Sequence, residues 1–200
     1  MRGVVLALAV LAVPLLAAGV ARADWQPTQR VETYQVTGET GISLYQSIGA
    51  NGPKIGIGRA IAYTTFDLKW SRDYRPQADG GCTLVAAKPW LVIITKLPKP
   101  AGKLPPATRA AWETFIAGIV AHERVHGEMI EEMVRRIEAL SVGFTAADDP
   151  GCKKVRQELQ KRLGELSQEQ RARSREFDRV EMSDGGNVHR LILGLVNGAP

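Results

Sequence analysis

The stretch TRAAWETFIAGIVAHERVHGEMIEEMVRRIEAL, residues 108–140, decides how the rest of the chain is interpreted. Its apolar side chains recur at steps of three and four residues, which is the period of one face of an α-helix. Pro106 precedes the stretch, and Gly143 follows it at the kind of position where helices often stop. The stretch therefore predicts one long helix between these two residues. Its apolar face comprises Trp112, Phe115, Ile116, Ile119, Val120, Met129, Met133, Ile137 and Leu140.

The middle of this helix carries the pattern His-Glu-Arg-Val-His, with His122 and His126 on either side of Glu123. Residues four apart share a face of a helix, so both imidazoles can bind one ion while Glu123 projects beside them. Neutral imidazoles are good zinc ligands, and zinc with an open coordination position lowers the pKa of a bound water to about 7. Glu123 would then act as general base and pass the proton to a leaving amine. The alternative is a helix whose histidines only pack and whose glutamate is solvated.

A catalytic zinc site needs a third protein ligand, which this pattern does not supply. The remaining histidine of the chain, His189, is the first candidate, and Asp184 or Asp178 is the alternative. A second helix that runs antiparallel to the first would return this region toward His122 and His126. The lengths agree, because about 20 residues lead from His122 to the hairpin and about 30 lead back, at about 1.5 Å per residue.

The two flanks of the long helix predict the other elements. Residues 24–100 contain short runs in which apolar and polar side chains alternate, which is typical of strands. Residues 106–182 read as a helical hairpin, and residues 183–200 as a short apolar tail. We therefore expect an α+β fold, in which a small antiparallel sheet is followed by two antiparallel helices. The length favours a single domain over residues 24–200.

The second helix of the hairpin has a clear start signal in the sequence. Asp149 is a good N-cap residue, and Pro150 suits the first helical position. Val155, Leu159, Leu163, Leu166, Phe177 and Val180 form the apolar stripe of this helix. We therefore expect the helix to begin directly after Asp149.

The first 23 residues have the pattern of a secretory signal peptide. Arg2 is followed by an uncharged run from Val4 to Val20, and then by the small-x-small sequence Ala21-Arg22-Ala23. Pro14 and Gly19 interrupt the run, which argues against the alternative of a retained anchor helix. We therefore expect cleavage after Ala23, a periplasmic or secreted protein, and no stable membrane anchor.

The charge of the chain narrows the class of partner. The formal net charge is +5, and it falls to +3 when Arg2 and Arg22 leave with the signal peptide. So small a surplus does not support a nucleic-acid partner. Basic residues gather at 153–179 on the second helix, where they offer weak contact with an anionic envelope surface or, because glutamates are interspersed, a solvated helix face.

The two cysteines, Cys82 and Cys152, both lie in the exported part of the chain. An even number of cysteines in an oxidising compartment favours one disulfide. A closed loop of about 70 residues would stabilise the fold by roughly 4 kcal/mol on the chain-entropy model. Two separate buried thiols are the alternative.

These residues together resemble a bacterial family of predicted secreted zinc-dependent proteases, an uncharacterised domain family with an HExxH helix. The resemblance covers most of the chain after residue 23. It rests on Gly52-Pro53, on Arg59, Ala62, Thr64 and Trp70 in one strand, on Cys82 and Cys152, on Trp112 ten residues before His122, and on His122, Glu123, His126 and Phe177-Asp178. It implies a zincin-like fold and a metallopeptidase that takes a peptide or protein substrate with Zn²⁺ as cofactor.

By analogy with other zincins, a sheet edge around Leu91 to Thr95 would take the substrate as an added strand. Tyr63, Tyr74 or an arginine would stabilise the oxyanion.

The chain departs from that family at one point. The family usually follows the aromatic-Asp pair with Thr-x-His-Gly, whereas this chain has Ser183-Asp184-Gly185-Gly186, with glycine in place of the histidine. That histidine would be the natural third ligand, so the departure leaves His189 or Asp184 to substitute for it. It also leaves open an alternative function, a catalytically inactive zincin-like protein that binds or interacts at the cell envelope.

Overall fold

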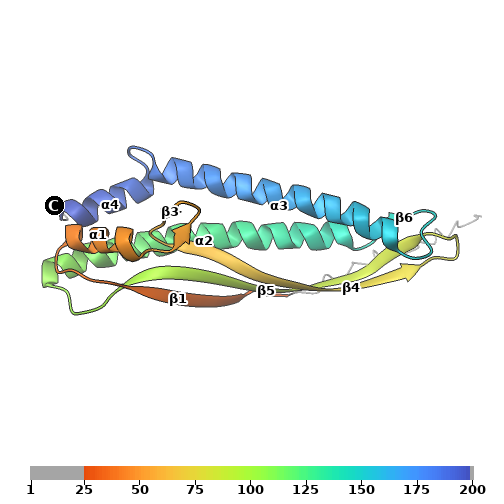
Figure 1. Ribbon diagram of the computed structural model, residues 1–200, viewed down its shortest axis with the longest axis horizontal. Coiled ribbons are helices and arrows are strands. Elements are labelled where there is room, and N and C mark those ends of the chain that lie inside the picture. Colours follow the sequence, from red (N-terminus) through yellow and green to blue (C-terminus); the bar gives the residue numbers. More distant parts are fainter. Residues whose placement is uncertain (1–24, 199–200) are drawn as a thin grey trace, which may run out of the picture.

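The computed structural model describes residues 25–198, so the expected signal peptide lies outside the described residues. The chain forms an α+β fold, as expected (Figure 1). In chain order the elements are β1 (Thr28–Val36), α1 (Gly41–Asn51), β2 (Lys54–Ile55), β3 (Gly58–Arg59), β4 (Tyr63–Pro76), β5 (Cys82–Pro100), α2 (Pro106–Ser141), β6 (Thr145–Ala146), α3 (Lys153–Met182) and α4 (Asn187–Asn197).

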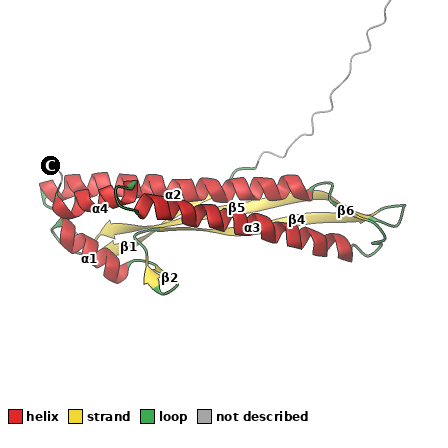
Figure 2. Cartoon of the chain, turned by 90° about the horizontal axis from the view of Figure 1, so that it is seen from above, coloured by secondary structure: helices red, strands yellow, loops and turns green. Residues whose placement is uncertain are grey.

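The molecule is a long two-layer rod in which α2 and α3 run antiparallel along one face of the sheet (Figures 1 and 2). The predicted long helix is confirmed, because α2 continues for 36 residues, or about 54 Å at 1.5 Å per residue. Its apolar face meets the sheet where Leu91 and Ile93 pack against Ile130, Met133 and Val134. The sheet and the α2–α3 hairpin therefore share one hydrophobic core, which fixes the position of α2 on the sheet.

The sheet is mixed and not wholly antiparallel. β4 pairs antiparallel with β5, whereas β1 pairs parallel with β5 on its other side. Alternation of apolar and polar residues predicts a strand but not its partner, and β1 is separated from β5 by α1 and three other strands. The parallel pairing could therefore not be read from the strand pattern.

Most of the apolar tail expected at residues 183–200 forms the helix α4. Val188 and Leu195 are buried, and they join a core cluster with Trp112, Phe115 and Ile119 from α2. The two helices approach closely at Gly118, where a Cβ would lie 2.3 Å from a methyl of Leu191. Glycine at this position therefore lets α4 pack directly on α2, close to the histidines.

The start of α3 lies later than the sequence predicts. The helix begins at Lys153, and Cys152 occupies the N-cap position with left-handed backbone angles. Asp149 nevertheless caps the helix, because its Oδ1 accepts a hydrogen bond from the Lys153 amide (2.7 Å) and its Oδ2 from the Val155 amide (2.9 Å). Asp149 therefore caps the helix as predicted, but it lies four residues before the first helical residue, Lys153.

Cys82 and Cys152 form the predicted disulfide, which joins the start of β5 to the start of α3. Both cysteines are buried, together with Ala146 and Val155. The bond therefore closes the end of the rod farthest from α4.

None of the helices between residues 25 and 198 is long and apolar enough to cross a membrane.

Candidate metal centre

The histidine pair lies in the buried stripe of α2. His122 and His126 occupy the same face as Ile119 and Ile130, and both imidazoles are buried. Polar side chains in such a stripe lose contact with water, so each needs a partner inside the protein. The partner comes from α3, whose antiparallel course brings Asp178 against the pair.

Three donor atoms meet at this point. The Oδ1 of Asp178 lies 3.1 Å from Nε2 of His122 and 2.8 Å from Nε2 of His126. The two Nε2 atoms lie 3.1 Å from each other. These three residues are the group in the described part of the chain that could hold a metal ion.

Hydrogen bonds alone do not account for this triangle. If each Nε2 carries a hydrogen and donates it to Oδ1, two N–H groups lie side by side with their nitrogen atoms only 3.1 Å apart. Neither nitrogen can then accept a hydrogen bond from the other. One shared cation satisfies all three atoms at once. Two imidazoles and a carboxylate are also the donor set of catalytic zinc sites, where donor atoms of a tetrahedral ion lie about 3.4 Å apart. These three residues could therefore hold a metal ion.

The other nitrogen of each imidazole faces an oxygen atom of α3. Nδ1 of His126 lies within hydrogen-bond distance of Oγ of Ser174, at 2.7 Å. Nδ1 of His122 is buried without a hydrogen-bond partner among the described residues, and a carboxylate oxygen of Glu181 lies 3.6 Å from it. Phe177 stacks on the His122 ring, with the two ring centroids 4.7 Å apart. A proton on each Nδ1 would leave both Nε2 lone pairs directed at the shared point, which is the usual arrangement around metal-binding histidines.

Glu123 lies beside the triangle and has its own support from the sheet. Its side chain is only 5% exposed. Oγ1 of Thr64 donates a hydrogen bond of 2.7 Å to its Oε2, and the same hydroxyl lies 3.3 Å from Oγ1 of Thr95. Thr64 has one hydrogen and gives it to the closer carboxylate, so Thr95 donates to Thr64. The two threonines thus hold Glu123 in one orientation.

Burial and the neighbouring polar groups shift the pKa values of His122, Asp178 and Glu123 in opposite directions. Burial by itself would lower the pKa of His122, but its hydrogen bond to Asp178 and the charge of Glu123 raise this pKa above its ordinary value. Burial would raise the pKa of Asp178, yet the hydrogen bonds with His122 and His126 hold it well below its usual range. Burial raises the pKa of Glu123, and the Thr64 hydrogen bond opposes this change. The lowered pKa keeps Asp178 ionised, which is the form of a carboxylate that binds a metal ion.

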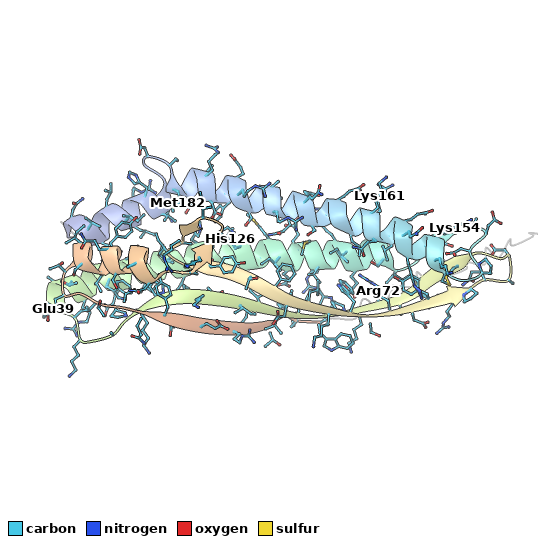
Figure 3. The ribbon with its side chains drawn as sticks, in the orientation of Figure 1. Glu39, Arg72, His126, Lys154, Lys161 and Met182 are labelled. Carbon is cyan, nitrogen blue, oxygen red and sulfur yellow. A yellow bond between two sulfur atoms is a disulfide. The ribbon has the colours of Figure 1, made fainter. Side chains whose placement is uncertain are left out.

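A cleft of about 380 Å³ opens onto these residues. Its floor comes from α2 and its walls from the segment that joins β3 to β4 and from the adjoining ends of α3 and α4. That segment is held in place by the hydroxyl of Tyr34, which donates a 2.6 Å hydrogen bond to the carbonyl of Ile61. Figure 3 shows His126 near the middle of the rod and Met182 at the nearby end of α3.

Of the three candidate third ligands, the structure brings Asp178 to the histidine pair. It does not bring His189, which lies on α4 with Nδ1 accepting a 3.0 Å hydrogen bond from the Gly185 amide. Asp184 is exposed in the turn between α3 and α4. Gly185 has a positive φ of 75° in that turn, so glycine suits the position. Gly185, which stands where the family usually has histidine, therefore lies in a turn. Its presence removes no ligand atom from the group formed by His122, His126 and Asp178.

Two further expectations about the site are corrected. Leu91 to Thr95 is not a sheet edge, because β5 is the central strand and pairs with β1 on one side and β4 on the other. Its apolar run belongs to a strand that is covered on both edges. Tyr74 lies at the other end of the rod, under the guanidinium of Arg156, whereas Tyr63 lines the cleft.

The sequence does not point to Ser174 or Glu181, and it predicts Thr95 on a substrate-binding edge and not beside Thr64. A helical projection of the second helix would have drawn attention to two of them. Ser174, Asp178 and Glu181 recur at steps of four and three residues on one face of α3. Thr95 had no comparable signal, because its role depends on the β4–β5 register that places it opposite Thr64.

The comparisons with known proteins identify the family. Residues 31–186 match the family described as "Bacterial protein of unknown function (DUF922)". No curated protein and no solved structure matches the chain. The match begins within β1 and continues through α3, and it includes the histidine pair and Asp178. The chain belongs to this family.

Proposed function

With membership of this family as the premise, we propose that the protein is a zinc-dependent metallopeptidase of the periplasm or the extracellular space. His122, His126 and Asp178 hold the ion, and Glu123 is the general base. The observation that carries the proposal is the triangle of three donor atoms beside a buried carboxylate at the floor of a cleft. Structural zinc sites usually have four protein ligands, so a three-ligand site leaves one position for water or substrate.

Each residue then has a defined part in hydrolysis. A zinc ion at this point supplies a Lewis acid that lowers the pKa of water and polarises a carbonyl. Glu123 takes one proton from the attacking water, the water oxygen bonds to the peptide carbon, and the carbon–nitrogen bond breaks. Glu123 returns the proton to the leaving nitrogen, so the first products are a carboxylic acid and an amine, and the acid then gives its remaining proton to the amine. Thr64 holds Glu123 by the hydrogen bond of 2.7 Å to Oε2, which leaves Oε1 for this exchange.

The substrate strand belongs on β4. Within the described residues β4 pairs with β5 alone, so its other edge offers backbone groups to an extended peptide. The beginning of this strand, at Tyr63 and Thr64, lines the cleft. Tyr63 and Arg59, which line the same wall, are the donors available to a carbonyl oxygen that gains negative charge.

Two features support a location outside the cytoplasm. The signal-peptide pattern of residues 1–23 is one, although those residues lie outside the described part. The disulfide between Cys82 and Cys152 is the other, because such bonds persist in oxidising compartments. The peptidase would therefore meet its substrates in the envelope or the medium.

The test is digestion of a random peptide library by the mature, zinc-loaded chain. We expect cleavage that stops with a chelator and returns with zinc. Glu123→Gln should bind zinc normally and lose activity about 10²- to 10⁴-fold, the range for a general base. Glu128→Gln is the matched control, since Glu128 lies on the same helix with an exposed side chain and should leave activity unchanged. Zinc binding without any cleavage would favour the non-catalytic envelope protein instead.

A further inference from the structure

The cleft beside the three donors has an apolar character that the proposed chemistry does not use. Besides His122, Glu123, His126 and Asp178, its lining is dominated by aliphatic side chains. They come from three stretches of the chain that are distant in sequence. These residues are Ile55, Ala60, Ile61, Ala62, Ile119, Met182 and Val188.

The apolar lining continues from the floor to the rim. Ile119 and Val188 are buried at the base of the cleft. Ile55 is 45% exposed and Met182 is 52% exposed, although both are large apolar side chains. Exposed apolar groups on either side of one concave site are typical of a surface that a ligand covers.

The charged side chains that line the cleft already have partners within the protein. Arg59 donates a 2.6 Å hydrogen bond to the carbonyl of Gly52, at the base of the β2–β3 hairpin. The carboxylates of Glu123 and Asp178 are engaged by Thr64 and by the histidines. An acidic substituent here would therefore lie near the carboxylates of Glu123 and Asp178, whereas an apolar one would meet aliphatic side chains.

We infer that this part of the cleft is a subsite for a bulky aliphatic or aromatic side chain of an extended polypeptide. The inference rests on the proposed function, and it names the substrate class of the same site. The occupant is a polypeptide in extended form, because the free edge of β4 borders the subsite at Tyr63 and Thr64. The side chain next to the scissile bond then enters between Ile55 and Met182.

The chain provides matched pairs of variants for the test. Ile55 and Ile57 lie on the same small hairpin and are both exposed, but only Ile55 lines the cleft. Met182 and Val180 lie at the same end of α3 and are both exposed, but only Met182 lines the cleft. Substitution of exposed residues leaves the core intact, so these variants should fold.

The first measurement is the cleavage preference of the zinc-loaded chain on the peptide library. We expect leucine, isoleucine, methionine or phenylalanine beside the cut bond. Replacing a large apolar contact with a polar group costs about tenfold to a hundredfold in specificity. Ile55→Asp and Met182→Gln should reduce the apolar preference by that factor. Ile57→Asp and Val180→Gln should leave it within about twofold.

The second measurement reports binding without turnover. In the zinc-loaded Glu123→Gln chain, the methionine methyl signals are followed by NMR during titration with a capped pentapeptide that has leucine between two pairs of alanines. The Met182 signal, assigned by its loss in Met182→Gln, should shift. The same peptide with aspartate at its centre should cause a shift at least tenfold smaller at equal concentration.

The outcomes separate the two claims. Cleavage without an apolar preference overturns the subsite and leaves the peptidase proposal standing. Binding of the leucine peptide at Met182 without cleavage supports the subsite and contradicts the peptidase proposal. If there is neither cleavage nor a shift of the Met182 signal, the subsite is overturned as well.

Discussion

The two halves of α3 are held to α2 in different ways. The first half (residues 153–166) contributes the buried residues Val155 and Leu159 and packs Leu163 and Leu166 into the core. The second half (residues 167–182) contributes no buried residue. Apart from Phe177, which stacks on the His122 ring, its contacts with α2 are polar: Arg173 pairs with Glu132 at 2.9 Å, and Ser174 and Asp178 contact the histidines.

The difference shows how stability and function are divided along the rod. The first half lies near the disulfide and gains stability from apolar burial and a covalent link. The second half depends on surface ion pairs, each worth about 0–1 kcal/mol, and on the donors of the metal centre. A metal ion would therefore fasten the second half of α3 to α2 and complete the walls of the cleft.

The largest expected effect on this division is loss of the disulfide. Cys82→Ala with Cys152→Ala should lower the free energy of unfolding by about 4 kcal/mol, since the bond closes a loop of about 70 residues. Zinc stoichiometry should not change, because the bond lies at the start of α3, whereas the histidines contact its second half. Denaturant unfolding and metal analysis of the same preparation check both parts. Loss of zinc binding in a folded double variant would show that the two halves depend on each other.

Removal of zinc should affect the second half selectively. Amide hydrogen exchange in residues 170–182 should become about a hundredfold faster when a chelator is added, because the donors no longer hold this segment. Residues 153–166 should exchange at the same rate with and without metal. Uniform acceleration along α3 would contradict the proposed division.

A smaller effect is expected at the hydroxyl that orients His126. Ser174→Ala should weaken zinc binding about tenfold to a hundredfold, the usual cost of removing such a partner. Ser167→Ala is the matched control, because Ser167 lies on the same helix and accepts a hydrogen bond from Arg171 instead. Competition with a zinc chelator of known affinity measures both variants. Equal zinc affinities of the Ser174→Ala and Ser167→Ala variants would show that Ser174 does not support zinc binding.

The smallest effect is expected at the helix cap. Asp149→Ala removes the acceptor of the Lys153 and Val155 amides and should lower the free energy of unfolding by about 1 kcal/mol. Zinc affinity should stay the same, because α3 is capped at its far end. A shift in the midpoint of denaturant unfolding measures the change. An unchanged midpoint would show that Asp149 does not stabilise the helix.

The parts of the fold that depend on local pattern could be predicted from the sequence. The period of α2, the His122–Glu123–His126 arrangement and the pairing of the only two cysteines all follow from short-range spacing or from a count. The choice between Asp178, Asp184 and His189 did not follow, because it depends on which turn of α3 faces His126. The projection of Ser174 and Asp178 on one helix face narrows that choice but does not identify the partner.

The parts that depend on long-range pairing could not be predicted. The strand pattern of residues 91–95 fits an edge and a centre equally well until β1 is known to pair in parallel. The same is true of Thr95, which meets Thr64 only through the β4–β5 register. The position of α4 depends on the close approach at Gly118, which sequence periodicity does not report.

The central claim is that Asp178 completes a zinc site with His122 and His126. Its most direct test is the zinc content and affinity of Asp178→Ala and His189→Ala beside the unaltered mature chain. We predict one zinc per chain in the unaltered protein and in His189→Ala, and at least a hundredfold loss of affinity in Asp178→Ala. Full zinc binding in Asp178→Ala, with loss of zinc in His189→Ala, would contradict the account.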